Sequence, residues 1–60
     1  MNLYEKIKSI AEDKSISIPK LEEKVGLGNG AIGKWQTSTP KVDNLKKVAD
    51  ALGVSIEELI

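Results

Sequence analysis

The sequence predicts an all-α protein in which five short helices pack into one compact domain. Apolar residues recur at helical spacing along most of the chain, and no segment of useful length alternates polar and apolar residues between turn signals. Residues 15–18 alternate briefly but run into Pro19. A chain of 60 residues without cysteine must also build its core economically, which favours helices with local contacts. We therefore expect no strand and a single domain over residues 1–60.

The first helix is predicted from about Leu3 to Asp13. Asn2, followed three residues later by Glu5, forms a capping-box pattern at its start. The apolar positions that then repeat at helical spacing are Leu3, Ile7, Ile10 and Ala11.

A second helix of about two turns is expected to follow Ser17, which is a good N-cap residue. Pro19 is tolerated only in the first turn of a helix, which places the helix start just before it. Leu21 and Val25 form an apolar stripe, and Gly26 ends the helix.

A third short helix is predicted after Leu27, with Ala31, Ile32 and Trp35 facing inward and an end near Gln36. The polar residues 37–40 then form a loop that ends at a proline.

The fourth helix is the most regular and closes at Gly53. Ser55 and Glu58 form a second capping-box pattern, which predicts a last helical turn carrying Ile56, Leu59 and Ile60. The apolar face of the fourth helix consists of Val42, Leu45, Val48, Ala49 and Leu52.

Composition excludes several classes of site. The chain has no cysteine and no histidine, so disulfides, thiolate nucleophiles, Cys/His zinc sites and a histidine base are absent. Adjacent carboxylates on a helix point about 100° apart and do not converge on one ion. This applies to the pairs Glu12-Asp13, Glu22-Glu23 and Glu57-Glu58. We expect no enzyme, metal, cofactor or small-molecule ligand.

No apolar run approaches the roughly 20 residues of a membrane span, and the N-terminus lacks the order of a secretory signal. The sequence therefore predicts a cytoplasmic protein without a membrane partner. Its charges are balanced overall but unevenly distributed. Residues 28–47 carry four lysines and one aspartate, whereas residues 48–60 carry three acids and no lysine. A basic middle segment is the part of the chain suited to a polyanion.

Residues 18–36 have the pattern of two short helices joined at a glycine corner. Such helices share a core on their inner faces and leave the outer face of the second one protruding, where it can enter a groove. Glycine inside a helix costs about 0.5 to 1 kcal/mol relative to alanine, so two glycines in so short a helix indicate close approach to a partner. The expected outward positions are Asn29, Gly30, Gly33 and Lys34.

This pattern resembles the Cro and phage-repressor type of helix-turn-helix domain, also called the Xre family. The resemblance covers essentially the whole chain, through the stretches SISIPKLEEKVGLGNGAIGKW and TPKVDNLKKVADALGVSIEEL. It implies a compact five-helix, lambda-repressor-like domain with the helix-turn-helix at about residues 18–36. In that family the third helix lies in the DNA major groove, and many members are repressors that bind operators as dimers. The resemblance places the turn glycine at Gly26 and buried positions at Val25, Ile32 and Trp35. Leu21 and Leu45 complete the predicted turn and core through their apolar spacing.

The resemblance also assigns base-reading positions to Asn29, Gly30 and Lys34, with Gly28 and Gly33 alongside. Lysine can donate to guanine, and asparagine can pair with adenine. Glycine lets the backbone approach the bases closely. The loop adds phosphate contacts. The predicted DNA-binding positions are Gly28, Asn29, Gly30, Gly33, Lys34, Ser38, Thr39 and Lys41.

The sequence departs from the family at three positions. Glu22 stands where a small residue, commonly alanine, packs between the two helices. Ile18 replaces a polar residue that often touches phosphate, and Gly28 replaces a serine or threonine N-cap.

Alternatives stay open for single residues and for the whole domain. Asn29 could cap the third helix instead of contacting DNA, and Lys34, Lys41, Lys46 and Lys47 could form an ordinary solvated face. Trp35 is expected in the core because a lone indole on an apolar stripe is usually buried. The domain could also be a protein-interaction module, such as an antitoxin or regulator head, that binds a partner through its acidic tail.

The length leaves no room for the dimerisation or ligand-sensing domain that many such regulators carry. We therefore expect the chain to be an excised DNA-binding head of a bacterial or phage transcriptional regulator. On its own it should be monomeric and bind DNA weakly, with dimerisation on a palindromic operator.

Overall fold

A computed structural model describes residues 2–59, in which three α-helices and two short 3-10 helices surround one core. In chain order they are α1 (Leu3–Asp13), α2 (Ile18–Val25), η1 (Ile32–Gln36), α3 (Val42–Leu52) and η2 (Ile56–Glu58). Residues 2–59 contain no strand. The all-α prediction is therefore confirmed, but the expected third and fifth α-helices are 3-10 helices instead.

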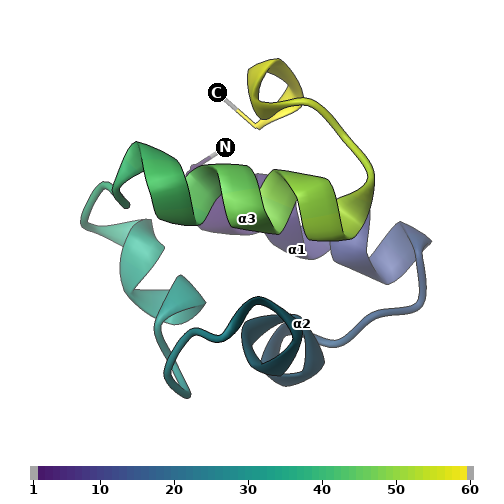
Figure 1. The fold of residues 1–60 in the computed structure, drawn as a ribbon, viewed down its shortest axis with the longest axis horizontal. Helices are drawn as coiled ribbons and strands as arrows, with labels where there is room; N and C mark the ends of the chain where they lie inside the picture. Colours follow the sequence, from purple (N-terminus) through teal and green to yellow (C-terminus); the bar gives the residue numbers. More distant parts are fainter. Residues whose placement is uncertain (1, 60) are drawn as a thin grey trace.

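Each of the three α-helices packs against at least two other helical segments. Figure 1 shows α3 lying in front of α1, with α2 below both and seen nearly end-on, and η1 at the left side. Helix α1 contacts η1 and α2, whereas α3 contacts α2 and η2. None of these described helices combines the length and apolarity needed to cross a membrane.

The predicted N-caps of α1 and α2 are both present. The Asn2 side-chain oxygen accepts a hydrogen bond from the N–H of Glu5 at 2.9 Å, and the Ser17 hydroxyl oxygen accepts one from the N–H of Lys20 at 3.3 Å. Each bond satisfies an N–H group that has no partner within the helix. The starts of both helices are therefore set by local sequence.

Glycine ends α2 and α3, as predicted. Gly26 and Gly53 have φ values of +77° and +71°, in the left-handed region where a side chain is strained. The residue after each glycine donates its N–H back into the last turn, which is the Schellman arrangement. These bonds run from Leu27 to the carbonyl of Glu22 at 2.9 Å and from Val54 to the carbonyl of Ala49 at 3.0 Å.

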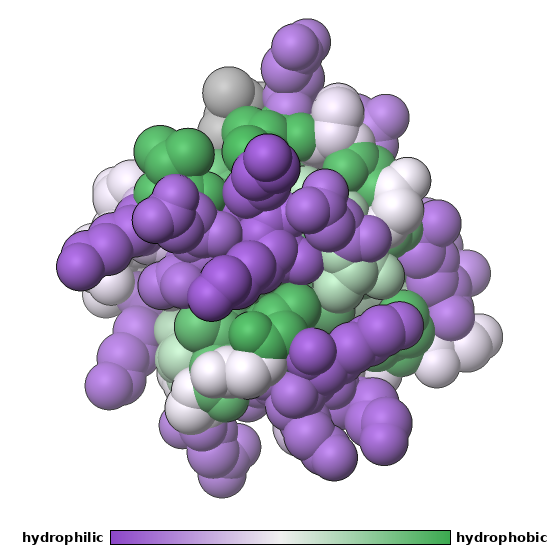
Figure 2. All heavy atoms as spheres, viewed as in Figure 1, coloured by the Kyte–Doolittle hydropathy of each residue, from purple (hydrophilic) through white to green (hydrophobic). Residues whose placement is uncertain are grey.

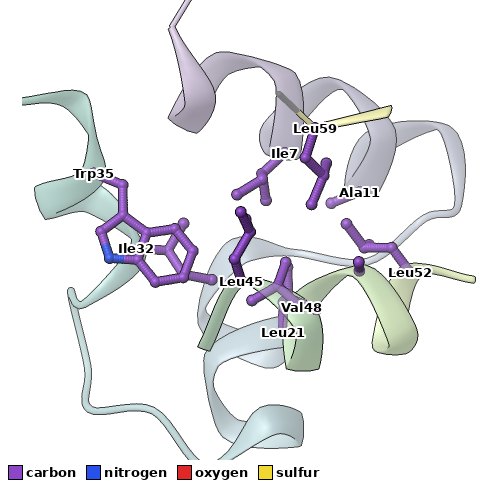
Figure 3. Close-up of a cluster of buried hydrophobic side chains, with 10 residues drawn as sticks. Ile7, Ala11, Leu21, Ile32, Trp35, Leu45, Val48, Leu52 and Leu59 are labelled. Atoms are coloured by element: carbon purple, nitrogen blue, oxygen red, sulfur yellow. The ribbon is translucent and has the colours of Figure 1, made fainter. Parts of the chain in front are cut away.

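The core lies between α1, α2, η1 and α3. Figure 3 shows the Trp35 indole beside Ile32 at one edge of this cluster, with Leu45 and Val48 reaching into it from α3. Trp35 is 8% exposed, so it is a core residue, as expected. Val25 is only half-buried and packs against the rim. The buried apolar residues are Ile7, Ala11, Leu21, Ile32, Trp35, Leu45, Val48, Ala49, Leu52 and Leu59.

The third helix starts later than predicted. Gly30 has a φ of +86°, which a right-handed helix does not accommodate, and the N–H of Ala31 donates to the carbonyl of Gly28 at 3.1 Å to close a turn. The 3-10 helix η1 begins only at Ile32. Of the two glycines expected inside this helix, Gly30 thus lies before it, whereas Gly33 lies within η1.

The predicted capping box at the last turn does not form. The Ser55 side chain accepts no capping hydrogen bond, and η2 comprises three residues. The turn is closed by the main chain, because the N–H of Glu58 donates to the carbonyl of Ser55 at 3.1 Å. Leu59 is buried behind η2, while Ile60 lies outside the described residues.

Candidate nucleic-acid interface

Two segments form a candidate interface, residues 28–34 and residues 37–41. The first contains the turn at Gly28 and the start of η1, and the second is the loop that leads into α3. Figure 1 shows both along one edge of the molecule, the first below the second. Every predicted DNA-binding position is exposed except Gly33, which is partly exposed. The fold therefore presents the predicted positions to solvent on connected segments.

The turn at residues 28–31 projects Asn29 outward. The bond from Ala31 to Gly28 and the positive φ at Gly30 are the features of a type II turn, in which the third position favours glycine. No atom lies within 4 Å of a Cβ built on Gly30, so the backbone conformation and not packing demands glycine here. Asn29 is exposed at the second position of this turn.

Glu22 holds this turn from beneath and was missed as a site residue. It is 3% exposed, and its two carboxylate oxygens accept hydrogen bonds from the N–H of Gly30 at 3.0 Å and of Ile32 at 2.9 Å. Asn29 does not cap η1, because the N-cap residue is Ala31 and no side chain makes a capping hydrogen bond there. The larger residue at this family position therefore supports the corner between α2 and η1.

The sequence did contain a signal for a buried Glu22. Ile18, Leu21 and Val25 lie on one stripe of α2, and a helix places the residue four after Ile18 on that same stripe. That residue is Glu22. A carboxylate on an apolar stripe indicates a buried acceptor with backbone or side-chain donors close by.

Lys34 and Gln36 are the exposed residues of η1, and Gly33 lies beside Lys34. Lys34 is exposed, whereas Gly33 is partly covered. Gly33 has no positive φ, and nothing lies within 4 Å of a Cβ built on it. Gly28 shares both properties. Neither backbone conformation nor packing within the domain requires glycine at these two positions.

The loop after η1 is fixed at its start by Ser38. Its hydroxyl donates to the carbonyl oxygen of Lys34 at 2.9 Å, and its N–H donates to the same oxygen at 3.1 Å. The hydroxyl hydrogen predicted to meet a phosphate is thus engaged within the domain. Thr39 and Lys41 follow on the exposed loop.

The charge of this surface is positive. The sequence has no acidic residue between Lys24 and Val42, and both Lys34 and Lys41 are exposed there. Glu22 is the one buried charged residue among residues 2–59, and backbone amides surround its carboxylate. Within the same range, no group of three or more potential ligands lies close enough to hold a metal ion.

A family model described as the Cro/C1-type HTH DNA-binding domain matches residues 6–60. The chain belongs to this family. A search among curated proteins found no match. The match includes α2, η1 and the whole candidate interface of this Cro/C1-type domain, whereas the position of the helix-turn-helix at about residues 18–36 stays a prediction. Membership implies DNA binding, and the resemblance inferred from the sequence is confirmed.

Proposed function

We propose that this Cro/C1-type domain is the sequence-specific DNA-binding head of a bacterial or phage transcriptional regulator, acting as a repressor. It inserts the turn at residues 28–31 and η1 into the major groove of its operator. The observation that carries the proposal is the exposed, acid-free surface of residues 28–41 on a helix-turn-helix. Such a surface supplies both base contacts and positive charge for phosphates.

Lys34 and Asn29 are the proposed base-reading side chains. Lys34 is exposed on η1 and can donate to O6 or N7 of guanine. Asn29 is exposed at the tip of the turn, free of a capping role, and offers the paired donor and acceptor that suit adenine. Around these two side chains, the backbone is not covered by further side chains at Gly28, Gly30 and Gly33. It can therefore come close to the base edges.

The loop supplies the proposed phosphate contacts. Lys41 is an exposed cation and Thr39 an exposed hydroxyl, both on the segment that leads into α3. Ser38 keeps the loop in place through Lys34, and its contact with phosphate stays a prediction. Contacts of this kind set the register of a protein on DNA and contribute the salt-dependent part of its affinity.

Two copies on a palindromic operator would provide specificity beyond one half-site. A helix-turn-helix dimer reads half-sites about one helical turn of DNA apart. We propose dimerisation on the operator, with the single domain monomeric in solution and located in the cytoplasm beside the chromosome.

An NMR titration of labelled domain with a short DNA duplex tests the proposal without a known operator. We expect amide shift changes concentrated at residues 28–34 and 37–41, fading as salt is raised. Operator sequences can then be selected from random duplexes. No shift changes at low salt would contradict DNA binding through this surface.

The alternative is a protein-interaction module, and exposed acids at the opposite end of the sequence favour it. Asp50, Glu57 and Glu58 are all exposed. A docking surface usually contains a contiguous apolar patch, whereas Figure 2 shows hydrophobic atoms on the viewed face as separate patches between hydrophilic side chains. A salt-insensitive, flat DNA titration together with a partner bound at Glu57 and Glu58 would support this alternative.

A further inference from the structure

We infer that Glu22 is a positioning residue for DNA recognition, which holds the base-reading turn against α2. This inference rests on the proposed DNA-binding function and adds a residue that does not itself touch DNA. Glu22 is 3% exposed, so it cannot act as a contact residue. Its influence on DNA must pass through the groups to which it is bonded.

The carboxylate of Glu22 binds one backbone N–H within the exposed turn and one at the start of η1. Oε1 accepts from the N–H of Gly30 at 3.0 Å, and Oε2 accepts from the N–H of Ile32 at 2.9 Å. Hydrogen bonds to an ionised carboxylate are stronger than neutral ones, and two of them define an orientation. Asn29 lies just before this pair of amides and Lys34 just after it, so both side chains take their position from the carboxylate.

The main chain of Glu22 acts on the other side of the corner. Its carbonyl oxygen accepts from the N–H of Gly26 and from the N–H of Leu27, the latter at 2.9 Å, which ends α2. One residue therefore closes the first helix with its backbone and holds the start of the second with its side chain. The relative placement of α2 and η1 is determined at this residue.

Because Glu22 is negatively charged, an electrostatic role and a positioning role predict opposite effects of a neutral substitution on DNA affinity. A negative charge beneath a DNA-binding surface repels phosphates, so replacing it with a neutral group should tighten binding if charge alone matters. If the carboxylate positions the turn, the same replacement should weaken binding. Glutamine keeps the size of the side chain but retains one acceptor oxygen, so one of the two backbone N–H groups loses its partner.

Glu23 provides the matched control. It is the next residue of α2, carries the same charge and is exposed. Glu23→Gln removes one negative charge from the same region and leaves the bonds to Gly30 and Ile32 in place. Glu22→Ala is a second test variant, because alanine favours the helix and removes both acceptor oxygens.

The experiment compares the wild type, Glu22→Gln, Glu22→Ala and Glu23→Gln on a duplex selected from random sequence with the wild type. Circular dichroism establishes folding, amide hydrogen exchange reports on Gly30 and Ile32, and DNA binding is measured as a function of salt and of base identity. We expect both Glu22 variants to fold and to exchange at Gly30 or Ile32 faster. Their specific affinity should fall about tenfold, with relaxed base preference and an unchanged salt slope.

Glu23→Gln should bind as tightly as the wild type or more tightly. The inference is overturned if a folded Glu22→Gln variant binds DNA with the affinity and base preference of Glu23→Gln. It is also overturned if both Glu22 variants are unfolded, because Glu22 would then support the whole fold and not the interface. If the wild type selects no duplex, the proposed DNA-binding function fails first and the inference fails with it.

Discussion

The carbonyl oxygen of Lys34 is bound by Ser38 through two groups, the hydroxyl at 2.9 Å and the backbone N–H at 3.1 Å. The N–H of Thr37 also donates to this oxygen, at 3.2 Å. Lys34 thus presents its side chain to solvent while its main chain forms the end of η1. Hydrogen bonds therefore connect the residue proposed to read a base with the loop proposed to contact phosphates.

The first prediction concerns this junction. Ser38→Ala should lower the free energy of unfolding by about 0.5 to 1.5 kcal/mol, because the Lys34 carbonyl loses a hydrogen-bond donor. Thermal unfolding followed by circular dichroism measures the change. Thr39→Ala, at the next exposed position, is the control and should change stability by less than about 0.5 kcal/mol. Equal stability of the two variants would contradict the role of Ser38.

A second prediction separates glycines needed for folding from those needed for DNA. Gly33→Ala should stabilise the free domain by about 0.5 to 1 kcal/mol, since no positive φ or close packing requires glycine there. It should weaken DNA binding if the backbone approaches the bases at this position. Gly26→Ala should instead destabilise the domain by about 1 kcal/mol, because Gly26 has a φ of +77°. Unfolding and DNA titrations of both variants measure these changes, and unchanged DNA affinity of Gly33→Ala would exclude close approach.

The third prediction assigns Lys34 a base contact. Lys34→Ala should cost about 1 to 3 kcal/mol of binding free energy and relax the preference at one base pair of the operator. Lys14, which follows α1 and is also exposed, is the control, and its replacement by alanine should leave base preference unchanged. The measurement is a binding profile over a randomised operator. A profile for Lys34→Ala that keeps every preference of the wild type would rule out base reading by this residue.

Lys41 should behave differently from Lys34. If Lys41 contacts a phosphate, Lys41→Ala should weaken binding to all duplexes by a similar factor. It should also reduce the slope of log affinity against log salt by about 1. Titrations at three or more salt concentrations test this expectation. A Lys41→Ala variant that alters base preference but retains the wild-type salt slope would contradict it.

The last prediction concerns the end of α1, where a serine occupies a left-handed position. Ser15 has a φ of +59°, and the next residue, Ile16, donates its N–H to the carbonyl of Ala11 at 2.8 Å. Ser15→Gly should stabilise the domain by about 0.5 kcal/mol, because a non-glycine residue is strained there. Ser55→Gly is the matched control, since Ser55 has a φ of −84°, and it should lower stability. Thermal unfolding measures the stability of both variants. A Ser15→Gly variant less stable than Ser55→Gly would contradict the prediction.

Sequence reasoning found the elements whose limits depend on neighbouring residues. The bounds of α1 and the end of α3 at Gly53 match the predicted ones, because N-caps, terminal glycines and apolar spacing act within a few residues. The third helix was predicted from apolar spacing, and the fifth from the capping-box pattern of Ser55 and Glu58. In the third helix, the left-handed Gly30 delays the start of η1. In the last turn, Ser55 makes no capping hydrogen bond and η2 comprises three residues.

The sequence by itself determined the all-α class, the glycine corner at Gly26, the acid-free surface that points to DNA and most core residues on the apolar stripes. Val42, which was predicted on the apolar face of the fourth helix, is 71% exposed. Only the tertiary structure decided what Glu22 does. Its partners at Gly30 and Ile32 lie eight and ten residues away, and they come within hydrogen-bonding distance because α2 and η1 pack against the same core. A buried carboxylate is tolerated only where donors surround it, and the fold brings those donors together.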